Sequence, residues 1–331
     1  MIYVAGILVM VMMIMPVSAA VPDEPGQKVH VATIQSGDLK ATFRDNSESP
    51  GVLSGINSLF NLKSAPTFNA YDPDDPGASA GVNFEHIISG SKNPNNAFTP
   101  RHGEYTMYKL PDGKSVLWRR KAQDDPWRME STTKITVTKP HYLDVEFHCR
   151  AEDAGLFAPR DYAIMFWANY MNGVEKIPLH FRGIQQPGGE ETWIGADGPP
   201  GHVDWNCGGT YRHVEAADLK YDEDHNFKLN SWSYDYPRYT KPFYYGLASN
   251  GMVYMLMFDK AYTAEDEIRF SIFKFKLEKH PRPAWDYQYV IHKVETGKEY
   301  GYRARVVWKK FVSPEDCLKE YERWAKNSSD Q

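Results

Sequence analysis

Cysteine is scarce in this sequence: only Cys149, Cys207 and Cys317 occur in 331 residues. An odd number cannot pair completely within one chain, and none of the three has the CxxC or Cys/His spacing of a metal ligand. A disulfide framework is therefore excluded. One disulfide with one buried thiol, and three buried thiols, are both compatible with the sequence.

Blocks of basic charge and nucleotide-binding motifs are also absent. The 38 Lys and Arg residues are balanced by 43 Asp and Glu residues, which gives a formal net charge of −5. This balance argues against a nucleic-acid partner. No glycine-rich phosphate loop, nucleophile elbow or dinucleotide fingerprint occurs either. With these motifs absent, the sequence favours carbohydrate chemistry that needs only acid–base side chains.

Long apolar runs are limited to residues 1–20, which end in Val-Ser-Ala-Ala. These small residues form an A-x-A-like cleavage site, although no Lys or Arg precedes the run. About 20 apolar residues could instead span a bilayer as an uncleaved anchor. We expect a signal peptide over residues 1–20, cleavage before Val21, and a secreted or periplasmic protein without a stable membrane span.

Helical periodicity is almost missing after Pro25, and alternating patterns predict strands instead. Residues 134–139 and 143–150 alternate cleanly around a turn that contains Pro140, which predicts a hairpin. The apolar pattern of residues 268–277 changes phase, which predicts a β-bulge near Ile272 and Phe273. Further strands are predicted over residues 104–110, 115–119, 162–171, 177–184, 251–259, 285–294 and 300–311.

The single strong helix signal lies near the end of the sequence. Ser313 is a suitable N-cap before Pro314, and Leu318, Tyr321 and Trp324 form an apolar stripe, so we predict a helix over 313–326. No repeat or linker divides residues 21–331. The sequence therefore predicts one all-β domain. We expect an antiparallel two-layer sandwich with a concave face for a ligand and one C-terminal α-helix.

Ionisable side chains gather in the stretch GVNFEHIISGSKNPNNAFTPRHGEY, which has the pattern of two strands around a polar loop. Alternation places Asn83 and Glu85 on one face of the first strand and His86 on the other. In the second strand, His102 and Glu104 share a face. A histidine beside a carboxylate suits proton transfer, because imidazole titrates near neutral pH. We expect this stretch to form one wall of a sugar site.

A second group of candidates follows in the middle of the chain. His180 and Arg182 alternate with apolar residues, so they should form a cationic patch suited to a carboxylate or sulfate group. The long loop after them carries Trp193 and Trp205, and we expect it to roof the site. Further candidate contacts to a sugar are His202, His213, Tyr244 and Tyr245.

No compact metal-binding motif occurs in the sequence. His202, Asp204, His213 and Glu215 match no known ligand spacing. An acidic turn over residues 72–75 offers oxygen ligands for Ca²⁺, but such turns are frequently only solvated. We expect no metal and no cofactor, with Ca²⁺ at this turn as the weaker alternative.

Short motifs resemble those of one known family. The run TPRHGE, followed by a strand that ends at Trp118, resembles the Pro-x-His-Gly segment and downstream Trp of aldose 1-epimerases and related galactose-mutarotase-like proteins. The predicted hairpin and the strand FWANYMN follow in a similar order. The resemblance implies a β-supersandwich whose concave face binds sugars. The tracts NFEHI, YYG and WDYQYVI are similar to those of uncharacterised secreted proteins of polysaccharide-degrading bacteria.

Three positions depart from that family's pattern. The residues after Gly103 are Glu-Tyr-Thr, where the family has an arginine. Asn169 and Tyr170 stand where the family has its second histidine. The family's late catalytic glutamate has no clear counterpart, although Glu190 or Glu191 could approach the site from a loop. Simple mutarotation is therefore not implied.

These features predict an exported protein that acts on an oligo- or polysaccharide, acidic or sulfated, by His/carboxylate acid–base chemistry. An epimerase, a lyase and a glycoside hydrolase all remain open, and so does a non-catalytic carbohydrate-binding protein that uses the same face. We expect one concave pocket to be lined by His102, Glu104, His180 and Arg182. The catalytic candidates are His102, Glu104 and His180, and the substrate-binding candidates are Asn83, Glu85, Arg182, Trp193, His202, Trp205, His213, Tyr244 and Tyr245.

Overall fold

The structure is a computed structural model, and it describes most of the chain after the apolar N-terminal segment. The described residues are 24–47, 52–75, 77–89, 99–198, 207–220, 235–275 and 282–329. The predicted signal peptide and the candidates His202, Asp204 and Trp205 lie outside them.

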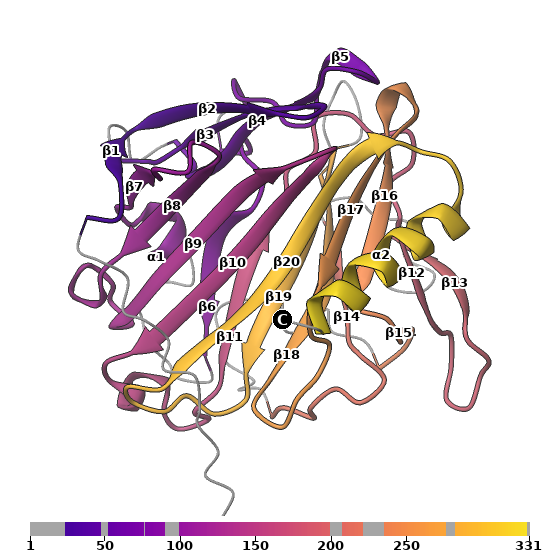
Figure 1. Cartoon of the computed structure of the whole chain (residues 1–331). Helices are drawn as coiled ribbons and strands as arrows, with labels where there is room; N and C mark the ends of the chain where they lie inside the picture. The colour runs from indigo at the N-terminus through magenta and orange to yellow at the C-terminus, as the bar shows by residue number, and fades with distance from the viewer. Residues whose placement is uncertain are drawn as a thin grey trace, which may run out of the picture.

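The largest element is an eleven-stranded antiparallel sheet with β20 near its centre, between β10 and β17 (Figure 1). The predicted hairpin is confirmed as β9 and β10, which pair along their full length. In sheet order the strands are β1 (Gln27–Val29), β7 (Thr106–Lys109), β8 (Ser115–Arg120), β9 (Met129–Thr138), β10 (Tyr142–Ala151), β20 (Glu299–Lys310), β17 (Met252–Phe258), β16 (Phe243–Ala248), β12 (Leu179–Ile184) and β13 (Thr192–Ala196), with β15 (Arg238–Tyr239) beside β12.

Two smaller antiparallel sheets complete the β-structure. The five-stranded sheet packs behind the large one in Figure 1, and a four-stranded sheet lies across the upper end. The five-stranded sheet contains, in order, β14 (Cys207–Tyr211), β18 (Asp266–Phe275), β19 (Arg282–Ile291), β11 (Ala163–Ala168) and β6 (Asn83–Ile88). The four-stranded sheet contains β2 (Val31–Ser36), β3 (Leu39–Arg44), β4 (Gly55–Asn61) and β5 (Ala65–Asn69).

Aromatic rings fill the core between the two larger sheets. Trp167 of β11 stacks on Tyr287 with ring centroids 5.2 Å apart, and on Phe84 at 4.7 Å. Phe147 of β10 reaches the same rings from the opposite sheet. Burial of such large apolar surfaces supplies most of the driving force for folding. The predicted two-layer antiparallel sandwich is confirmed.

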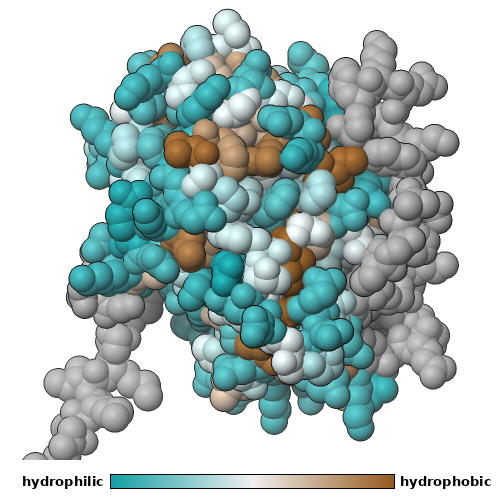
Figure 2. Space-filling model, turned by 90° about the vertical axis from the view of Figure 1, so that its right-hand side faces the viewer, coloured by the Kyte–Doolittle hydropathy of each residue, from teal (hydrophilic) through white to brown (hydrophobic). Residues whose placement is uncertain are grey.

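The C-terminal helix α2 (Pro314–Ser329) lies across the outer face of the large sheet (Figure 1). Its N-terminus is capped as the sequence predicts, because the Asp316 amide donates to Ser313 Oγ at 3.2 Å. Cys317 and Trp324 are buried against β16 and β17. The face at the right of Figure 1 is mostly hydrophilic, with a narrow apolar band across its upper part (Figure 2). No helix in the described part of the chain is long and apolar enough to cross a membrane.

Two local predictions are wrong. The expected bulge near Ile272 is absent, since β18 keeps one register with β19 from Asp266 to Phe275. The apolar pattern changes phase because β18 is buried on both faces: Ile272 enters the main core, whereas Phe273 packs against residues on the other face. Both phases can therefore be apolar without an extra residue.

The second error concerns the strand expected to begin at residue 104. Thr99–His102 form one helical turn, α1, and the strand begins only at Thr106. Asn46 stabilises this turn, because its Nδ2 donates to the carbonyl oxygens of Arg101 at 3.3 Å and Gly103 at 2.6 Å. Long-range bonds of this kind override a local alternation of polar and apolar residues.

Candidate functional site

A β-bulge in β6 places two ionisable residues on the same face of the five-stranded sheet. Phe84 pairs with Trp167 and His86 pairs with Phe166, so Glu85 is the extra residue between them. Strict alternation would separate Glu85 from His86, as the sequence suggested. The bulge instead brings His86 Nε2 within 3.6 Å of Glu85 Oε2. Bulges often redirect side chains in this way next to active sites.

The Glu85 carboxylate accepts hydrogen bonds from two other elements. Tyr170, just after β11, donates its hydroxyl to Glu85 Oε1 at 2.5 Å. Arg101 of α1 donates Nη1 to the same oxygen and, at 2.9 Å, to the Tyr170 hydroxyl oxygen. We call Glu85, His86, Arg101 and Tyr170 the Glu85 cluster. Three separate segments therefore converge on one carboxylate.

Burial controls the electrostatics of the Glu85 cluster. The Glu85 and His86 side chains are each 4% exposed, whereas Arg101 is 16% exposed and forms the outer rim. Burial raises the pKa of Tyr170 well above its ordinary value, although the Arg101 charge opposes the shift. Tyr170 is therefore a proton donor at neutral pH. The Arg101 guanidinium is the charge partner of the Glu85 carboxylate.

Other buried polar residues lie on this sheet face, beside an apolar cluster that includes Phe166 and Val290. Along one row of paired residues, His86 is followed by Phe166, Gln288 and Arg269. In the next row Asp286 accepts from the Asn169 amide at 2.8 Å, and burial raises its pKa well above the ordinary value. A buried polar row on the outer face of a sheet is costly without function or partners.

The segment that carries residues 216–220 covers part of this face. Arg269 donates Nε to Glu267 Oε1 at 2.8 Å and Nη2 to the Ala217 carbonyl oxygen at 3.3 Å. The Ala217 amide donates to Glu267 Oε2 at 3.2 Å. This side of the face is closed by protein contacts, which leaves the Glu85 cluster as the more accessible part.

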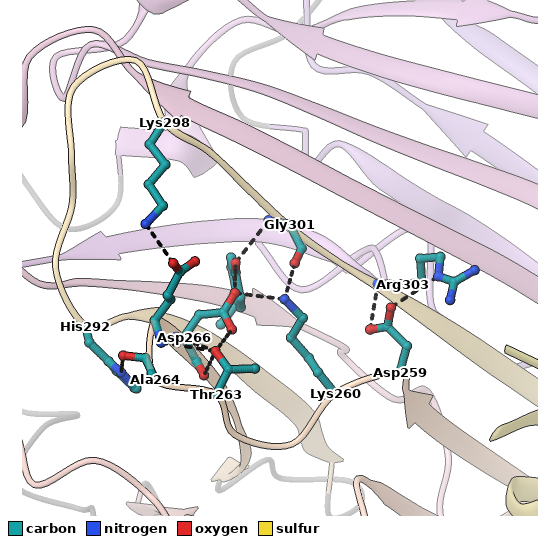
Figure 3. Close-up of polar contacts among 11 residues, drawn as sticks. Asp259, Lys260, Thr263, Ala264, Asp266, His292, Lys298, Gly301 and Arg303 are labelled. Carbon is teal, nitrogen blue, oxygen red and sulfur yellow. Dashed lines mark hydrogen bonds and ion pairs between the residues drawn. The ribbon is translucent and has the colours of Figure 1, made fainter. Parts of the chain in front are cut away.

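A second polar cluster joins the two larger sheets at one end of the sandwich. Asp266 of β18 accepts from Lys260 Nζ at 2.8 Å, Tyr289 hydroxyl at 2.5 Å and Thr263 Oγ1 at 2.7 Å. Lys260 also donates to the carbonyl of Gly301 in β20, as Figure 3 shows. We call Lys260, Thr263, Asp266 and Tyr289 the Asp266 cluster. Its bonds link β18 and β19 to β20, which is a structural role.

The histidine and carboxylate predicted to be catalytic near the Glu85 cluster are at the surface. His102 and Glu104 are exposed, one at the end of α1 and the other before β7. Arg101, adjacent to His102, makes the inward contact instead. Asn83 is buried, and its Nδ2 donates to the Ser54 carbonyl oxygen at 2.8 Å.

The candidates of the second group lie on the other side of the sandwich. Leu179 and Phe181 enter the core, so His180 and Arg182 project from the outer face of the eleven-stranded sheet. His180 stacks on Tyr245 at 4.9 Å, and the Arg182 guanidinium lies 5.4 Å from the Trp193 ring. Burial lowers the pKa of His180. The expectation that His102 and His180 share a pocket is wrong, because strand order separates them.

Tyr244 and His213 do not join either group. Tyr244 points into the core and donates its hydroxyl to the Trp285 carbonyl oxygen at 2.8 Å. His213 packs against Tyr239 with ring centroids 5.2 Å apart, and burial lowers its pKa. Arg182 already pairs with Glu191 at 2.7 Å.

Metal-binding geometry is not found among the described residues, which contain no group of three or more His, Cys, Asp or Glu side chains that could hold an ion. In the acidic turn, Asp72 and Asp75 both pair with Arg282, at 2.7 and 2.5 Å. Arg282 therefore offsets part of their negative charge. The three cysteines are free thiols, two of them buried.

Comparisons with known proteins give a similarity of fold alone. No family model matches the chain, and no curated protein sequence does. Among solved structures, a protein from Escherichia coli K12 provisionally described as an aldose 1-epimerase has a TM-score of 0.42 at 11% identity, over 85% of this chain and 99% of its own. A GalM/aldose epimerase homologue from C. elegans has a TM-score of 0.43 at 11% identity, over 85% and 100%.

A mutant of the heparan sulfate lyase HepC from Pedobacter heparinus is also similar in structure. Its TM-score is 0.44 at 8% identity, and the match covers 88% of this chain but only 36% of the lyase. At these scores the comparisons assign no residue and no reaction to this chain.

Sequence reasoning selected Glu85 but missed its partners. Arg101 lies inside the TPRHGE run, and Tyr170 stands at the position where the resembling family has histidine. Both residues therefore lie in motifs that the sequence analysis identifies, but the sequence pattern alone predicts no functional role for either one. Asp286 and Gln288 gave no signal, because they alternate with aromatic residues in an ordinary strand pattern.

Proposed function

We propose that the protein is an exported carbohydrate-active enzyme whose reaction centre is the Glu85 cluster. The observation that supports it most is the convergence of Arg101 and Tyr170 on a carboxylate placed by a β-bulge. Bulges are over-represented next to active sites, and a buried carboxylate beside a cation, a hydroxyl and a histidine is a candidate for a functional site. The apolar leader supports export.

Proton transfer is the chemistry that these residues can perform. In β-elimination the Glu85 carboxylate can accept a proton from a ring carbon while a C=C bond forms and the bond to the departing oxygen breaks, and the Tyr170 hydroxyl can donate its proton to that oxygen. The proton on Glu85 then returns to the Tyr170 oxygen along their hydrogen bond. Arg101 stabilises the negative charge that develops in this exchange. The proposed substrate is an oligo- or polysaccharide.

Epimerisation and β-elimination fit this site better than hydrolysis. Glycoside hydrolysis usually employs two carboxyl groups about 5 to 9.5 Å apart on either side of the bond. The other carboxyls of this sheet face, Asp286 and Glu267, are buried, and each already accepts a hydrogen bond from the chain. Among the described residues, Glu85 is the carboxylate that accepts a hydrogen bond from the Tyr170 hydroxyl.

A carbohydrate-binding protein without turnover is the second candidate. It is favoured by the fact that Glu85 is already neutralised by Arg101 and bonded to Tyr170. A site satisfied in this way could simply present donors to sugar hydroxyls.

A comparison of Tyr170→Phe with the unchanged protein tests the proposal. Incubation with uronic-acid polysaccharides would be followed by absorbance of unsaturated products, and incubation with neutral and acidic sugars by NMR exchange at ring carbons. We expect Tyr170→Phe to lower kcat about 100-fold or more with little change in KM, because it removes only the proton donor. Sugar binding without turnover would support the second candidate. Equal turnover in both proteins would refute the assignment of Tyr170.

A further inference from the structure

A polar groove lies on the outer face of the eleven-stranded sheet, away from the Glu85 cluster. Its volume is about 560 Å³, and the last turns of α2 form one wall with Trp324 and Asn327. The floor consists of outward-facing side chains from β9, β10 and β20. They include Lys134, Thr136, Asp144, Glu146, Arg303 and Arg305.

Each carboxylate of the groove already accepts at least one hydrogen bond from another residue of the chain. Asp144 accepts from Thr138 Oγ1 at 2.7 Å and from Arg305 Nε at 2.6 Å. Asp112, in the turn before β8, accepts from Ser115 Oγ at 2.6 Å. The acidic side chains of the groove are therefore largely satisfied.

Glu146 is the partial exception. One of its oxygens accepts from Lys134 Nζ at 2.8 Å, and its side chain is 39% exposed. Its other oxygen has no donor among the described residues, so it can accept from a ligand hydroxyl.

Donors in the groove retain more of their capacity. The Arg305 guanidinium lies 4.4 Å from the Tyr142 ring and 5.9 Å from the Trp324 ring, which fixes its position. Only its Nε bonds to a described residue, so two terminal nitrogens remain for a ligand. Lys114 is exposed at the rim and has no ion pair with any described carboxylate.

We propose that this groove binds a segment of an anionic oligosaccharide, one that carries carboxylate or sulfate groups. The fixed Arg305 guanidinium and the two lysines offer donors to the anionic groups, while Glu146, Thr136 and Asn327 can bond to sugar hydroxyls. A mixed floor of this kind suits a ligand with both types of group, and a uniformly basic groove would be expected for nucleic acid. The inference rests on the proposed function insofar as the ligand is a carbohydrate, and it adds a holding site that performs no chemistry.

Charge-neutralising substitutions at the rim provide the test. The variant Lys114→Gln/Lys134→Gln removes two positive charges from exposed or half-exposed positions of the groove. Its matched control, Lys40→Gln/Lys63→Gln, removes the same charge at exposed positions in and beside the four-stranded sheet. Both changes would be made in Tyr170→Phe protein, so that turnover does not consume the probe. Binding would be measured by titration calorimetry.

The probes are a size-fractionated heparin oligosaccharide, an oligogalacturonate, a neutral malto-oligosaccharide and inorganic sulfate. We expect the groove variant to bind at least one acidic oligosaccharide about tenfold more weakly than the control does, because two charge-assisted bonds are lost. Neutral oligosaccharide and sulfate alone should bind weakly to every protein.

Three results would overturn the inference: equal affinities in variant and control, equal binding of neutral and acidic oligosaccharides, or tighter binding of a single-stranded oligonucleotide than of any glycan. A different result would contradict the proposed function without affecting this inference. A chain that binds acidic oligosaccharide through the groove but never turns over a sugar would retain this inference and lose the assignment of the Glu85 cluster.

Discussion

The Glu85 cluster and the Asp266 cluster contain similar side chains in different settings. Each has a carboxylate that accepts from a tyrosine hydroxyl and from a cation. The Asp266 cluster joins strands of both large sheets through its hydrogen bonds to Gly301 of β20. The Glu85 cluster stands on a bulge at the outer face of one sheet. The same kinds of hydrogen bond therefore stabilise the fold where they connect the two sheets, and can bind a ligand where they lie on an outer face.

The largest effect is expected from Asp266→Ala, which removes the acceptor of three donors. The free energy of unfolding should fall by about 3 to 5 kcal/mol, because Lys260 loses its buried counter-charge and Tyr289 its acceptor. Urea denaturation measures this change. A loss below about 1 kcal/mol would show that the Asp266 cluster does not hold the two sheets together.

Gly103→Ala should have a smaller effect that links packing to the Glu85 cluster. A Cβ at this position would lie 2.2 Å from Nη2 of the buried Arg120 side chain. Overpacking of this kind costs about 1 to 3 kcal/mol, and the shift of α1 should also displace Arg101 from Glu85. Thermal denaturation and the turnover assay together check both parts. Unchanged stability with unchanged turnover would contradict the prediction.

Glu85→Gln separates charge from packing in the Glu85 cluster, because the side chain keeps its shape and loses its charge. We expect a loss of about 1 kcal/mol in the free energy of unfolding. Turnover should fall about 100-fold or more, since the proton acceptor is gone. The two clusters would then give opposite profiles, with stability sensitive at Asp266 and activity sensitive at Glu85. If the loss of stability and the loss of turnover stood in the same ratio for the Asp266 and Glu85 variants, the two clusters would not differ in role.

The smallest effect concerns pH and depends on histidines outside both clusters. Burial lowers the pKa of His180 and His213 in the folded chain. Their neutral forms are thus favoured by folding, so this part of the stability is complete above the unfolded value of about 6.5 and is lost as the pH falls below it. His180→Phe keeps a ring to stack on Tyr245. Its free energy of unfolding should fall less steeply between pH 7 and pH 5, as measured by urea denaturation at each pH, and an unchanged slope would contradict this.

The sequence was sufficient for elements whose signals are local. Alternation over residues 143–150 predicted the strand β10, whose Leu143, Val145 and Phe147 lie in the core, and Ser313 predicted the start of α2. It also identified the outward direction of His180 and Arg182. Patterns of this kind depend on near neighbours in the chain, so strand order does not affect them.

The candidate site needed information that is not local. Whether His102 lies near His180 depends on which strands are neighbours in the sheets. His102 belongs to α1, which packs against β6 of the five-stranded sheet, whereas His180 belongs to β12 of the eleven-stranded sheet. The bulge at Glu85 depends on the register with β11, and neither strand alone signals it. Arg101 turns inward because Asn46, far away in the sequence, fixes α1. Each of these is a tertiary constraint that overrides a local pattern.

The position of β20 has a consequence for how the chain is made. This strand joins two blocks of the largest sheet, one that ends at β10 and one that begins at β17. Until residues 299–310 have been synthesised, both blocks present an unpaired strand, and such edges invite association with other chains. Folding can therefore be completed only late in synthesis. A chain that ends before β20 would leave two half-sheets that share no hydrogen-bonded strand.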